Sequence, residues 1–481
     1  MNLSLSISDV GITLRTGEDI WQAARALLWK HGIALGYRRL LSDLAGKPGL
    51  RIGGGRVRIE PDLFERHFPS PMTSNAERKP SPARPRKVAS SDVKIMAGGY
   101  SMDVVDWRTG ELRPATGRDL AESVRVVEAS GSTGPYSVTV MDVPPLLSDI
   151  ATYKLCFENA RAIRGAYYSS PRQAPFLARM HEVMGEPFSV ILGAVSPLKL
   201  AEPDLDTLYA AADAGHNYRI RIVGYGVPGV GSPARLAQSA ALVMAENYGA
   251  KLLLALALPG WTASCGCHAG WATDFRYCNY AFGAPHDFAY RVINAHLSSA
   301  IQGIDPTAEP PAVAAVLGTG ACVPDEQAAA EKSASALLGA LLGTRDFDGA
   351  GNLCVDDVFS LEQFVLDCEI AQQAVKMVEA GAASKLMADM SGFDEEMASI
   401  LSGDEFLSLP STVEVMRAFY RPSLLFEHMK LRTWQGKGCP DLHAEAKKRV
   451  KQKLAESTFQ LDADKGKELA RIYQEAEKAL A

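Results

Sequence analysis

From about Gly98 onward, short apolar runs typical of β-strands alternate with amphipathic stretches typical of helices. The β-like runs begin at the following residues: Ser137, Arg161, Phe188, Tyr218, Lys251 and Ala312. Such alternation predicts a parallel sheet, and more than six strands in one domain favour a closed (β/α)₈ barrel, the TIM barrel. A doubly wound sheet is the alternative. It has no support as a nucleotide-binding fold, because no G-x-G-x-x-G follows the first strand and there is no P-loop lysine.

The pattern divides the chain into four parts. Residues 1–68 contain an amphipathic stretch, expected to be helical over 16–32, and form an N-terminal helical attachment. Residues 69–95 are rich in proline and polar side chains, which predicts a linker or surface strap. Residues 96–380 hold the predicted barrel. Residues 381–481 are helical and charged, and we expect them to pack on the outside of the barrel.

The composition excludes some classes of function. The 481 residues are 47% hydrophobic and 22% charged, enough for one large domain with attachments. A net charge of -6, without a concentrated basic patch, argues against nucleic acid as a partner. The longest apolar run, KLLLALAL from Lys251, is too short to cross a bilayer, and no signal-peptide pattern opens the sequence. We therefore expect a cytoplasmic protein with no membrane partner.

If a barrel forms, its chemistry belongs at the carboxyl ends of its strands. The aromatic residues expected near that rim are Tyr100, Trp107, Tyr168, Tyr225 and Phe359. Aromatic faces bind a quaternary ammonium through cation–π contacts worth roughly 0.5–2 kcal/mol each. The alternative is that several of these rings fill the barrel core.

One strand runs into a loop with special backbone requirements. The stretch RIVGYGVPGVGSP from Arg221 holds four glycines and two prolines. Glycine places backbone where a side chain would be in the way, so Gly229 and Gly231 are predicted to let a ligand approach closely.

Cysteine and histidine gather in the segment that follows the run from Lys251. Cys265, Cys267, His268 and Cys278 are four soft ligands, and a zinc or iron site is one hypothesis. Their spacing fits none of the common zinc patterns, and cysteine is often buried as a small hydrophobic residue. Eight cysteines spread over the whole chain do not form a disulfide framework, so most are expected to be reduced thiols.

Several longer segments resemble the trimethylamine methyltransferase family. In order they are EDIWQAARALLWKHGI, GGYSMDVVDWRTGELRPATGRDL, the SPL after the strand from Phe188, GYGVPGVGSPARLAQSAALVMAENYGAKLLL, GNLCVDDVFSLEQFVLDCEIA and FLSLPSTVEVMRAFYRPSLLFEHMKLRTWQGKG. The resemblance implies a TIM barrel with an N-terminal helical attachment. It also implies methyl transfer from a methylated amine to the Co(I) of a corrinoid (cobalamin) cofactor carried by a separate partner protein, as in methylamine metabolism of the methanogenic type.

The family also implies which residues act. Founding members carry pyrrolysine in a GxGxLxxGxxFS segment, and the matching stretch here is GAGNLCVDDVFS, which puts Asn352 at or next to that position. Asparagine lacks the imine ring thought to hold a free amine, so the resemblance implies a small quaternary amine such as glycine betaine. Asn352 is then the expected catalytic residue. The expected substrate-binding residues are Tyr100, Phe359, Tyr168, Tyr225, Gly229 and Gly231.

A betaine carboxylate also needs a donor. The candidates are Asn352, the amides of Gly229–Gly231, Arg113 and Arg164. One departure from the family is FLSLPST, which has Leu409 and Ser411 where relatives often carry histidine.

Two other functions stay open at this stage. One is a metal-assisted (zinc or iron) barrel methyltransferase that acts on a different substrate through the cysteine and histidine loop. The other is a non-catalytic module that binds a corrinoid protein. A homo-oligomer is expected in each case.

Overall fold

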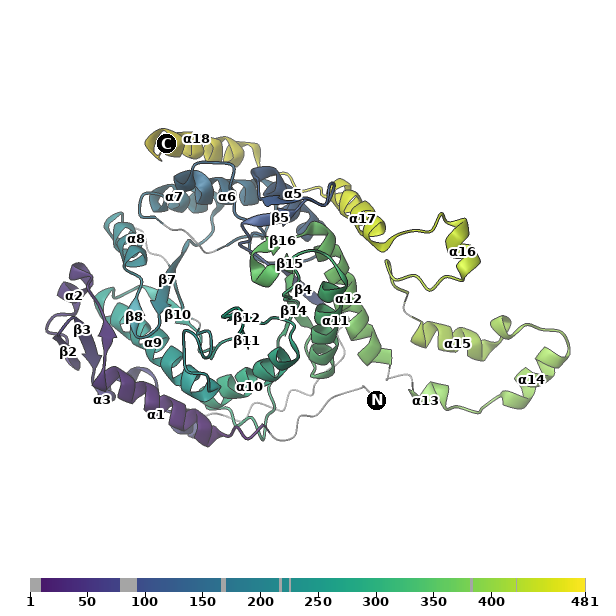
Figure 1. Cartoon of the computed structure of the whole chain (residues 1–481), viewed down its shortest axis with the longest axis horizontal. Coiled ribbons are helices and arrows are strands. Elements are labelled where there is room, and N and C mark those ends of the chain that lie inside the picture. Colours follow the sequence, from purple (N-terminus) through teal and green to yellow (C-terminus); the bar gives the residue numbers. More distant parts are fainter. Residues whose placement is uncertain are drawn as a thin grey trace.

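The computed structural model describes residues 10–77, 93–165, 170–215, 219–224, 226–380, 384–420 and 422–480. It shows a mixed α/β body from which a helical arm extends to one side (Figure 1). Tyr168, Tyr225 and residues 78–92 of the predicted linker lie outside the described residues.

The first helix, α1 (Leu14–Lys30), is amphipathic and buries Ile20, Trp21 and Leu28 along one face. It begins two residues before the predicted start, where Thr13 and Thr16 form a capping box. A Cβ on Gly17 would lie 2.3 Å from the carbonyl oxygen of Ala300, so glycine is required where α1 meets α10 (Pro285–Ile301). The remaining N-terminal elements are β1 (Ile33–Ala34), α2 (Arg38–Leu44), β2 (Leu50–Gly53), β3 (Arg56–Ile59), α3 (Pro61–His67) and α4 (Pro71–Glu77).

The parallel strands fall into two groups. In the first, β9 (Arg219–Val223) lies between β7 (Ser189–Val195) and β10 (Thr262–Cys265), and this group continues through β8 (Lys199–Leu200) into the N-terminal strands. In the second, β14 (Asp346–Ala350) lies between β13 (Ala315–Val316) and β4 (Lys94–Ala97).

Two smaller sheets complete the strands. A four-stranded sheet has the order β15 (Asn352–Leu353), β16 (Val358–Phe359), β5 (Asp103–Val105) and β6 (Leu112–Pro114). A short hairpin pairs β11 (Thr273–Asp274) with β12 (Asn279–Tyr280). The 3₁₀ turn η1 (Cys354–Asp356) joins β15 to β16, and we call the segment from Asn352 to Phe359 the site hairpin.

Helices surround the strands, with α6 to α12 following one another around the body in Figure 1. They are α5 (Gly117–Ala129), α6 (Pro145–Asn159), α7 (Ala174–Met184), α8 (Glu202–Asp213), α9 (Leu236–Ala257), α10, α11 (Glu326–Leu341) and α12 (Leu361–Ala380). One core cluster runs from α1 to the C-terminal helices and includes Trp21, Tyr153 and Phe347, each at most 1% exposed.

The structure shows no closed barrel, so the predicted (β/α)₈ ring is not confirmed. Among the described residues, no ladder joins the sheet of β7, β9 and β10 to the sheet of β13, β14 and β4. The stretch from Ser137 forms no named strand, and its pairing along β4 and the residues after it is limited to two isolated parallel bridges, Met96 with Thr133 and Ser101 with Val138. Gly134 then has φ of +143° and Pro135 has no N–H, which interrupts the ladder at this point.

A second correction concerns the apolar run from Lys251. It was predicted as a strand, but it forms the C-terminal half of α9. Periodicity alone does not separate a short buried strand from a buried helix. Of the described helices, α9 is the one long and apolar enough to cross a membrane, yet 72% of its most apolar stretch is buried inside the protein, as in the core helix of many folds.

The C-terminal region has two different parts. The arm contains α13 (Ser384–Met387), α14 (Phe393–Leu401), η3 (Phe406–Ser408), α15 (Pro410–Phe419) and α16 (Leu431–Gly436) (Figure 1). It exposes large apolar side chains, including Leu401 and Leu407, at 83% and 80%. After the arm, α17 (Leu442–Glu456) packs on α5 and α12, and α18 (Ala463–Leu480) packs on α6 and α7.

Candidate functional site

A cavity of about 660 Å³ opens between the two groups of parallel strands. Its lining includes Gly98, Gly99 and Tyr100 after β4, Asp348 and Gly349 in β14, and Asn352 and Asp356 in the site hairpin. From the other group of strands comes Arg221 of β9, and Arg164, Trp271 and Phe282 add the remaining functional groups. Residues far apart in the sequence thus meet at one place, mostly where strands end, as in other α/β folds.

A buried ion pair holds the backbone at the start of the site hairpin. Lys332 Nζ and Asp367 Oδ2 are 2.7 Å apart, and neither side chain is exposed. Lys332 also donates to the carbonyl oxygen of Asn352 at 2.8 Å, while Gly351 N–H donates to Asp367 at 2.7 Å. Burial lowers the pKa of Lys332 and raises the pKa of Asp367. The pair fixes the backbone that presents Asn352 to the cavity.

The Asn352 side chain is 4% exposed and lies directly over Gly98. A Cβ at Gly98 would come within 2.0 Å of the Asn352 amide, so this approach requires glycine. Asn352 Nδ2 donates to Asp356 Oδ1 at 2.7 Å, whereas its Oδ1 is buried without a hydrogen-bond partner among the described residues. An unsatisfied buried acceptor beside a cavity is suited to a ligand that brings a donor.

Two carboxyl groups share this side of the cavity. Burial raises the pKa of Asp356, and the hydrogen bond from Asn352 opposes that shift. Burial also raises the pKa of Asp348, and the charge of Asp356 adds to the effect. The sequence alone gave no reason to select Asp348, because only the register of β14 turns it toward the cavity.

Two arginines also line the cavity, but they differ in their partners. Arg164 forms a bidentate ion pair with Glu186, with both N–O distances at 2.9 Å, and donates to neighbouring carbonyl oxygens. Arg221 is exposed within its strand, and among the described residues its guanidinium has no hydrogen-bond or ion-pair partner. Of the two arginines, Arg221 is therefore the one with free donors, and it comes from a different group of strands than Asp348.

The aromatic part of the lining differs from the one expected. Tyr100 does reach the cavity, from a left-handed backbone with φ of +70°, and its ring meets Tyr136 edge-on at 4.9 Å. Trp271 and Phe282 also line it, with ring centroids 5.6 Å apart. Phe359 instead lies in the core against Gly351, 1% exposed. Trp107 does not line the cavity but belongs to the hydrogen-bond network around Arg113 that is described below.

The glycine-rich loop has a structural explanation. Gly229 has φ of +86°, and a Cβ there would lie 2.6 Å from the ring of Phe275. Thr273 Oγ1 donates to the carbonyl oxygen of Pro228 at 2.8 Å. The segment that approaches the loop closely is therefore the protein's own hairpin of β11 and β12, and neither Gly229 nor Gly231 belongs to the cavity lining.

The four predicted metal ligands do not converge. No group of three or more His, Cys, Asp or Glu side chains within the described ranges is placed to hold a metal ion. Cys267 is partly buried and its thiol donates to the carbonyl oxygen of Ala240, and burial raises the pKa values of Cys265 and Cys267 to about 11 and 12. The ring of His268 packs 4.2 Å from Trp271, and burial lowers its pKa to about 4. Cys278 is exposed, and it does not converge with the partly buried Cys265 and Cys267, so the geometry does not support the zinc or iron hypothesis.

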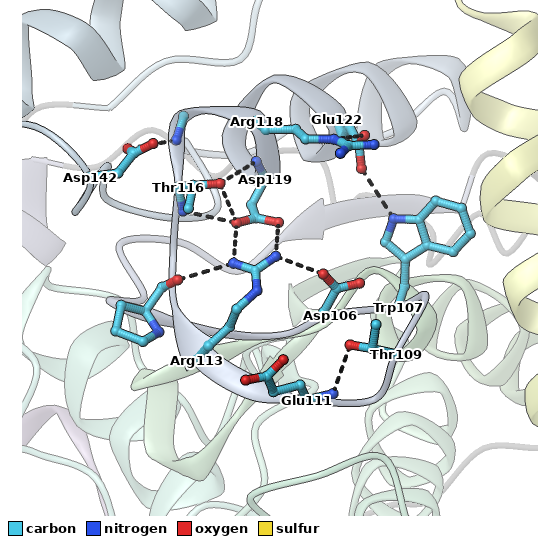
Figure 2. Close-up of polar contacts among 12 residues, drawn as sticks. Asp106, Trp107, Thr109, Glu111, Arg113, Thr116, Arg118, Asp119, Glu122 and Asp142 are labelled. Carbon is cyan, nitrogen blue, oxygen red and sulfur yellow. Dashed lines mark hydrogen bonds and ion pairs between the residues drawn. The ribbon is translucent and has the colours of Figure 1, made fainter.

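Arg113, a candidate partner for a substrate carboxylate, is already paired with carboxylates of the protein itself (Figure 2). Its guanidinium bonds both oxygens of Asp119, at 2.7 and 2.9 Å, and Asp106 at 2.7 Å. In the same network, Trp107 Nε1 donates to Glu122, and Asp142 accepts from the amide of Gly117. This network secures the start of α5, and none of these residues lines the cavity.

Comparison with known proteins identifies the relatives of this chain. A family model described as "Trimethylamine methyltransferase (MTTB)" matches residues 16–479. The chain belongs to the trimethylamine methyltransferase family. This confirms the family resemblance seen in the sequence. Asn352, Tyr100, Asp348 and Asp356 thus line one cavity in a member of this family.

Individual relatives are distant. The trimethylamine methyltransferase MttB of Methanosarcina barkeri is 28% identical over 325 residues, which are 67% of this chain and 61% of that protein. MttB1 of Methanosarcina mazei is 27% identical over 325 residues with the same two coverages. The matches thus span less than two thirds of the length of these two relatives.

One solved structure is also similar. The crystal structure of the monomethylamine methyltransferase MtmB of Methanosarcina barkeri covers 92% of this chain and 88% of that chain. Its sequence is 10% identical and the TM-score is 0.38.

Proposed function

We propose that this protein removes a methyl group from a small quaternary amine that carries a carboxylate, of the glycine betaine type, and passes it to a corrinoid carried by a partner protein. Membership of the trimethylamine methyltransferase family supports the reaction class. The relatives from Methanosarcina are named as trimethylamine methyltransferases, so trimethylamine is the competing substrate.

The observation that carries the choice of substrate is the distribution of charge in the cavity. Arg221 presents free guanidinium donors from β9, and Asp348 and Asp356 present carboxyl groups from β14 and the site hairpin. A zwitterion can pair with both kinds of charged group, because its carboxylate binds the arginine and its ammonium group lies near the acids. Trimethylamine has no group for Arg221.

The protein's own residues bind and orient this substrate. Tyr100, Trp271 and Phe282 offer aromatic surface to the methylated nitrogen, where a cation–π contact is worth about 0.5–2 kcal/mol. These cation–π contacts, together with the two acids, stabilise the bound substrate while its nitrogen is still positively charged. Because the positive charge leaves nitrogen as the C–N bond breaks, they strengthen binding more than turnover. The acceleration of the transfer step then comes from holding the methyl group in line with its acceptor.

The acceptor is expected to come with its own protein. Among the described residues, the cavity lining contains neither histidine nor cysteine, so it offers cobalt no such ligand. The corrinoid is expected to approach through the open side of the cavity. When bound, the corrinoid supplies a cobalt nucleophile that accepts the methyl group.

The test compares amines and one pair of variants. Purified protein is incubated with a reduced corrinoid protein, and cobalt methylation is followed by absorbance with glycine betaine, choline or trimethylamine. Glycine betaine is expected to react fastest. Arg221→Gln is expected to lower kcat/KM for glycine betaine by about 10- to 100-fold, the value of a charged hydrogen bond of roughly 1.5–3 kcal/mol. Arg219→Gln, on the same strand outside the cavity lining, is the control.

Faster reaction of trimethylamine, or equal losses in the two arginine variants, would refute the zwitterion. Binding of the corrinoid protein without any methyl transfer would instead favour the non-catalytic module. The cytoplasmic location and the homo-oligomer expected from the sequence stay predictions.

A further inference from the structure

Two thiols meet beside the cavity, at the outer end of the site hairpin. Cys322 follows β13, Cys354 follows β15, and their sulfur atoms are 2.9 Å apart. Both are free thiols, since a disulfide bond has a length of about 2.05 Å. The residues are 32 positions apart in the sequence, so the contact is a product of the tertiary fold.

Backbone hydrogen bonds connect the two segments that carry the cysteines. Cys354 N–H donates to the carbonyl oxygen of Ala321 at 2.7 Å, and Val355 N–H donates to Thr319 at 3.1 Å. These bonds hold the loop after β13 against the site hairpin. The sulfur atoms that they hold together, at 2.9 Å, are close enough to form a disulfide bond after a small movement.

The hairpin at this point has a strained conformation. Cys354, Val355 and Asp356 have φ of +48°, +56° and +79°, which non-glycine residues rarely adopt. Asp356 is held there by the hydroxyl of Ser101, which donates to its carbonyl oxygen at 2.7 Å, and its carboxylate accepts from Asn352. A covalent link at Cys354 therefore acts on the backbone that carries two cavity residues.

We propose that Cys322 and Cys354 are a modification site, a dithiol that a small-molecule disulfide oxidises to an intrachain disulfide bond. The link clamps the loop after β13 to the site hairpin. This inference goes beyond the proposed function and does not depend on it.

The exposed position of Cys322 makes its thiolate the attacking group. It attacks one sulfur of the small disulfide, which gives a mixed disulfide and releases one small thiol. Cys354 then attacks the Cys322 sulfur, loses its proton to solvent and releases the second small thiol. Two protein thiols are oxidised by two electrons in total, and one small disulfide is reduced. Burial and the neighbouring Cys322 raise the pKa of Cys354 to about 12, so Cys354 is the thiol that reacts second.

The full-length protein tests this directly. It is incubated with oxidised glutathione, denatured and alkylated with iodoacetamide, and its thiols are counted by intact mass. Eight thiols are expected before oxidation and, in the species whose mass shows no glutathione adduct, two fewer after it, with full recovery on treatment with dithiothreitol. Peptide mapping is expected to find Cys322 linked to Cys354.

Variants and hydrogen exchange separate this pair from other cysteines. On oxidation, the Cys322→Ser variant is expected to form no intrachain disulfide bond. The Cys439→Ser variant, which lacks an exposed cysteine of the C-terminal region, is still expected to lose two thiols. In oxidised wild-type protein, amide exchange over residues 352–359 is expected to slow relative to the reduced form. Retention of all eight thiols, a link between other cysteines or between two chains, or unchanged exchange in a linked protein would overturn the proposal.

Discussion

Asn352 Nδ2 donates a hydrogen bond to Asp356 Oδ1 across the site hairpin, at 2.7 Å. The bond joins the residue expected from the family resemblance to a carboxylate that burial makes harder to ionise. The same Asn352 keeps a buried oxygen without a partner among the described residues. The two residues therefore form one unit, with an acceptor left for a ligand.

Asn352→Leu is expected to lower methyl transfer by about 10- to 100-fold, because Asp356 loses a charged hydrogen bond worth roughly 1.5–3 kcal/mol. The side chains have similar size, so the fold should persist. The measurement is kcat/KM with glycine betaine, together with the thermal unfolding of the variant. An unchanged kcat/KM would remove Asn352 from the site.

Gly98→Ala is expected to displace the Asn352 side chain, since the new methyl group would lie within 2.0 Å of it. Substrate affinity should fall while most of the fold remains. Gly53→Ala is the matched control, because a Cβ there meets nothing within 4 Å. Ligand binding measured by calorimetry distinguishes the two variants, and equal affinities would contradict the packing described here.

Lys332→Met is expected to destabilise the protein by about 3–5 kcal/mol, since it leaves Asp367 buried without its cation. The double variant Lys332→Met with Asp367→Leu should recover part of that loss. Urea unfolding of the three proteins measures the effect. A double variant no more stable than the single one would show that the pair is not coupled in this way.

His181 is expected to make stability depend on pH. It is packed among Tyr153, Phe157 and Phe188, neither ring nitrogen has a hydrogen-bond partner among the described residues, and burial lowers its pKa to about 4. The unfolded chain binds a proton near the ordinary pKa of about 6.5, whereas the folded protein does not bind it until about 4. Stability is therefore lost as the pH falls from 6.5 towards 4.

Between pH 7 and pH 5 this histidine should cost about 2 kcal/mol, from 1.4 kcal/mol for each unit of pH below 6.5. His181→Phe, which suits the aromatic surroundings, is expected to remove that part of the loss. Urea midpoints at the two pH values are the measurement. The same slope in both proteins would show that His181 is not held neutral. His268, whose pKa is also lowered to about 4, should leave a residual slope.

Local patterns account for much of what the sequence predicted. The amphipathic face of α1 was visible in the order of its residues, and its predicted start was two residues late because Thr13 provides the cap. The run from Lys251 was mistaken for a strand, because leucine and alanine suit a buried helix equally well. Tyr100 and Asn352 were predicted for the site and do line one cavity.

Other site residues could not be found in this way. Arg221 and Asp348 look like ordinary strand residues in the sequence, and only the register of β9 and β14 turns them toward a common space. The close approach at Gly229 was assigned to a ligand, yet Phe275 of the chain itself fills it. The cysteine and histidine loop suggested a metal because of its composition, which says nothing about where the side chains point.

By itself, the sequence determined the alternation of strands and helices and the family, because both depend on the order of residues along the chain. The tertiary structure alone decided that the strands form two parallel groups, that Arg221 lines one cavity with two acids, and that Cys322 meets Cys354. The physical reason is that strand register and loop packing depend on contacts between residues distant in the sequence, which no local pattern records.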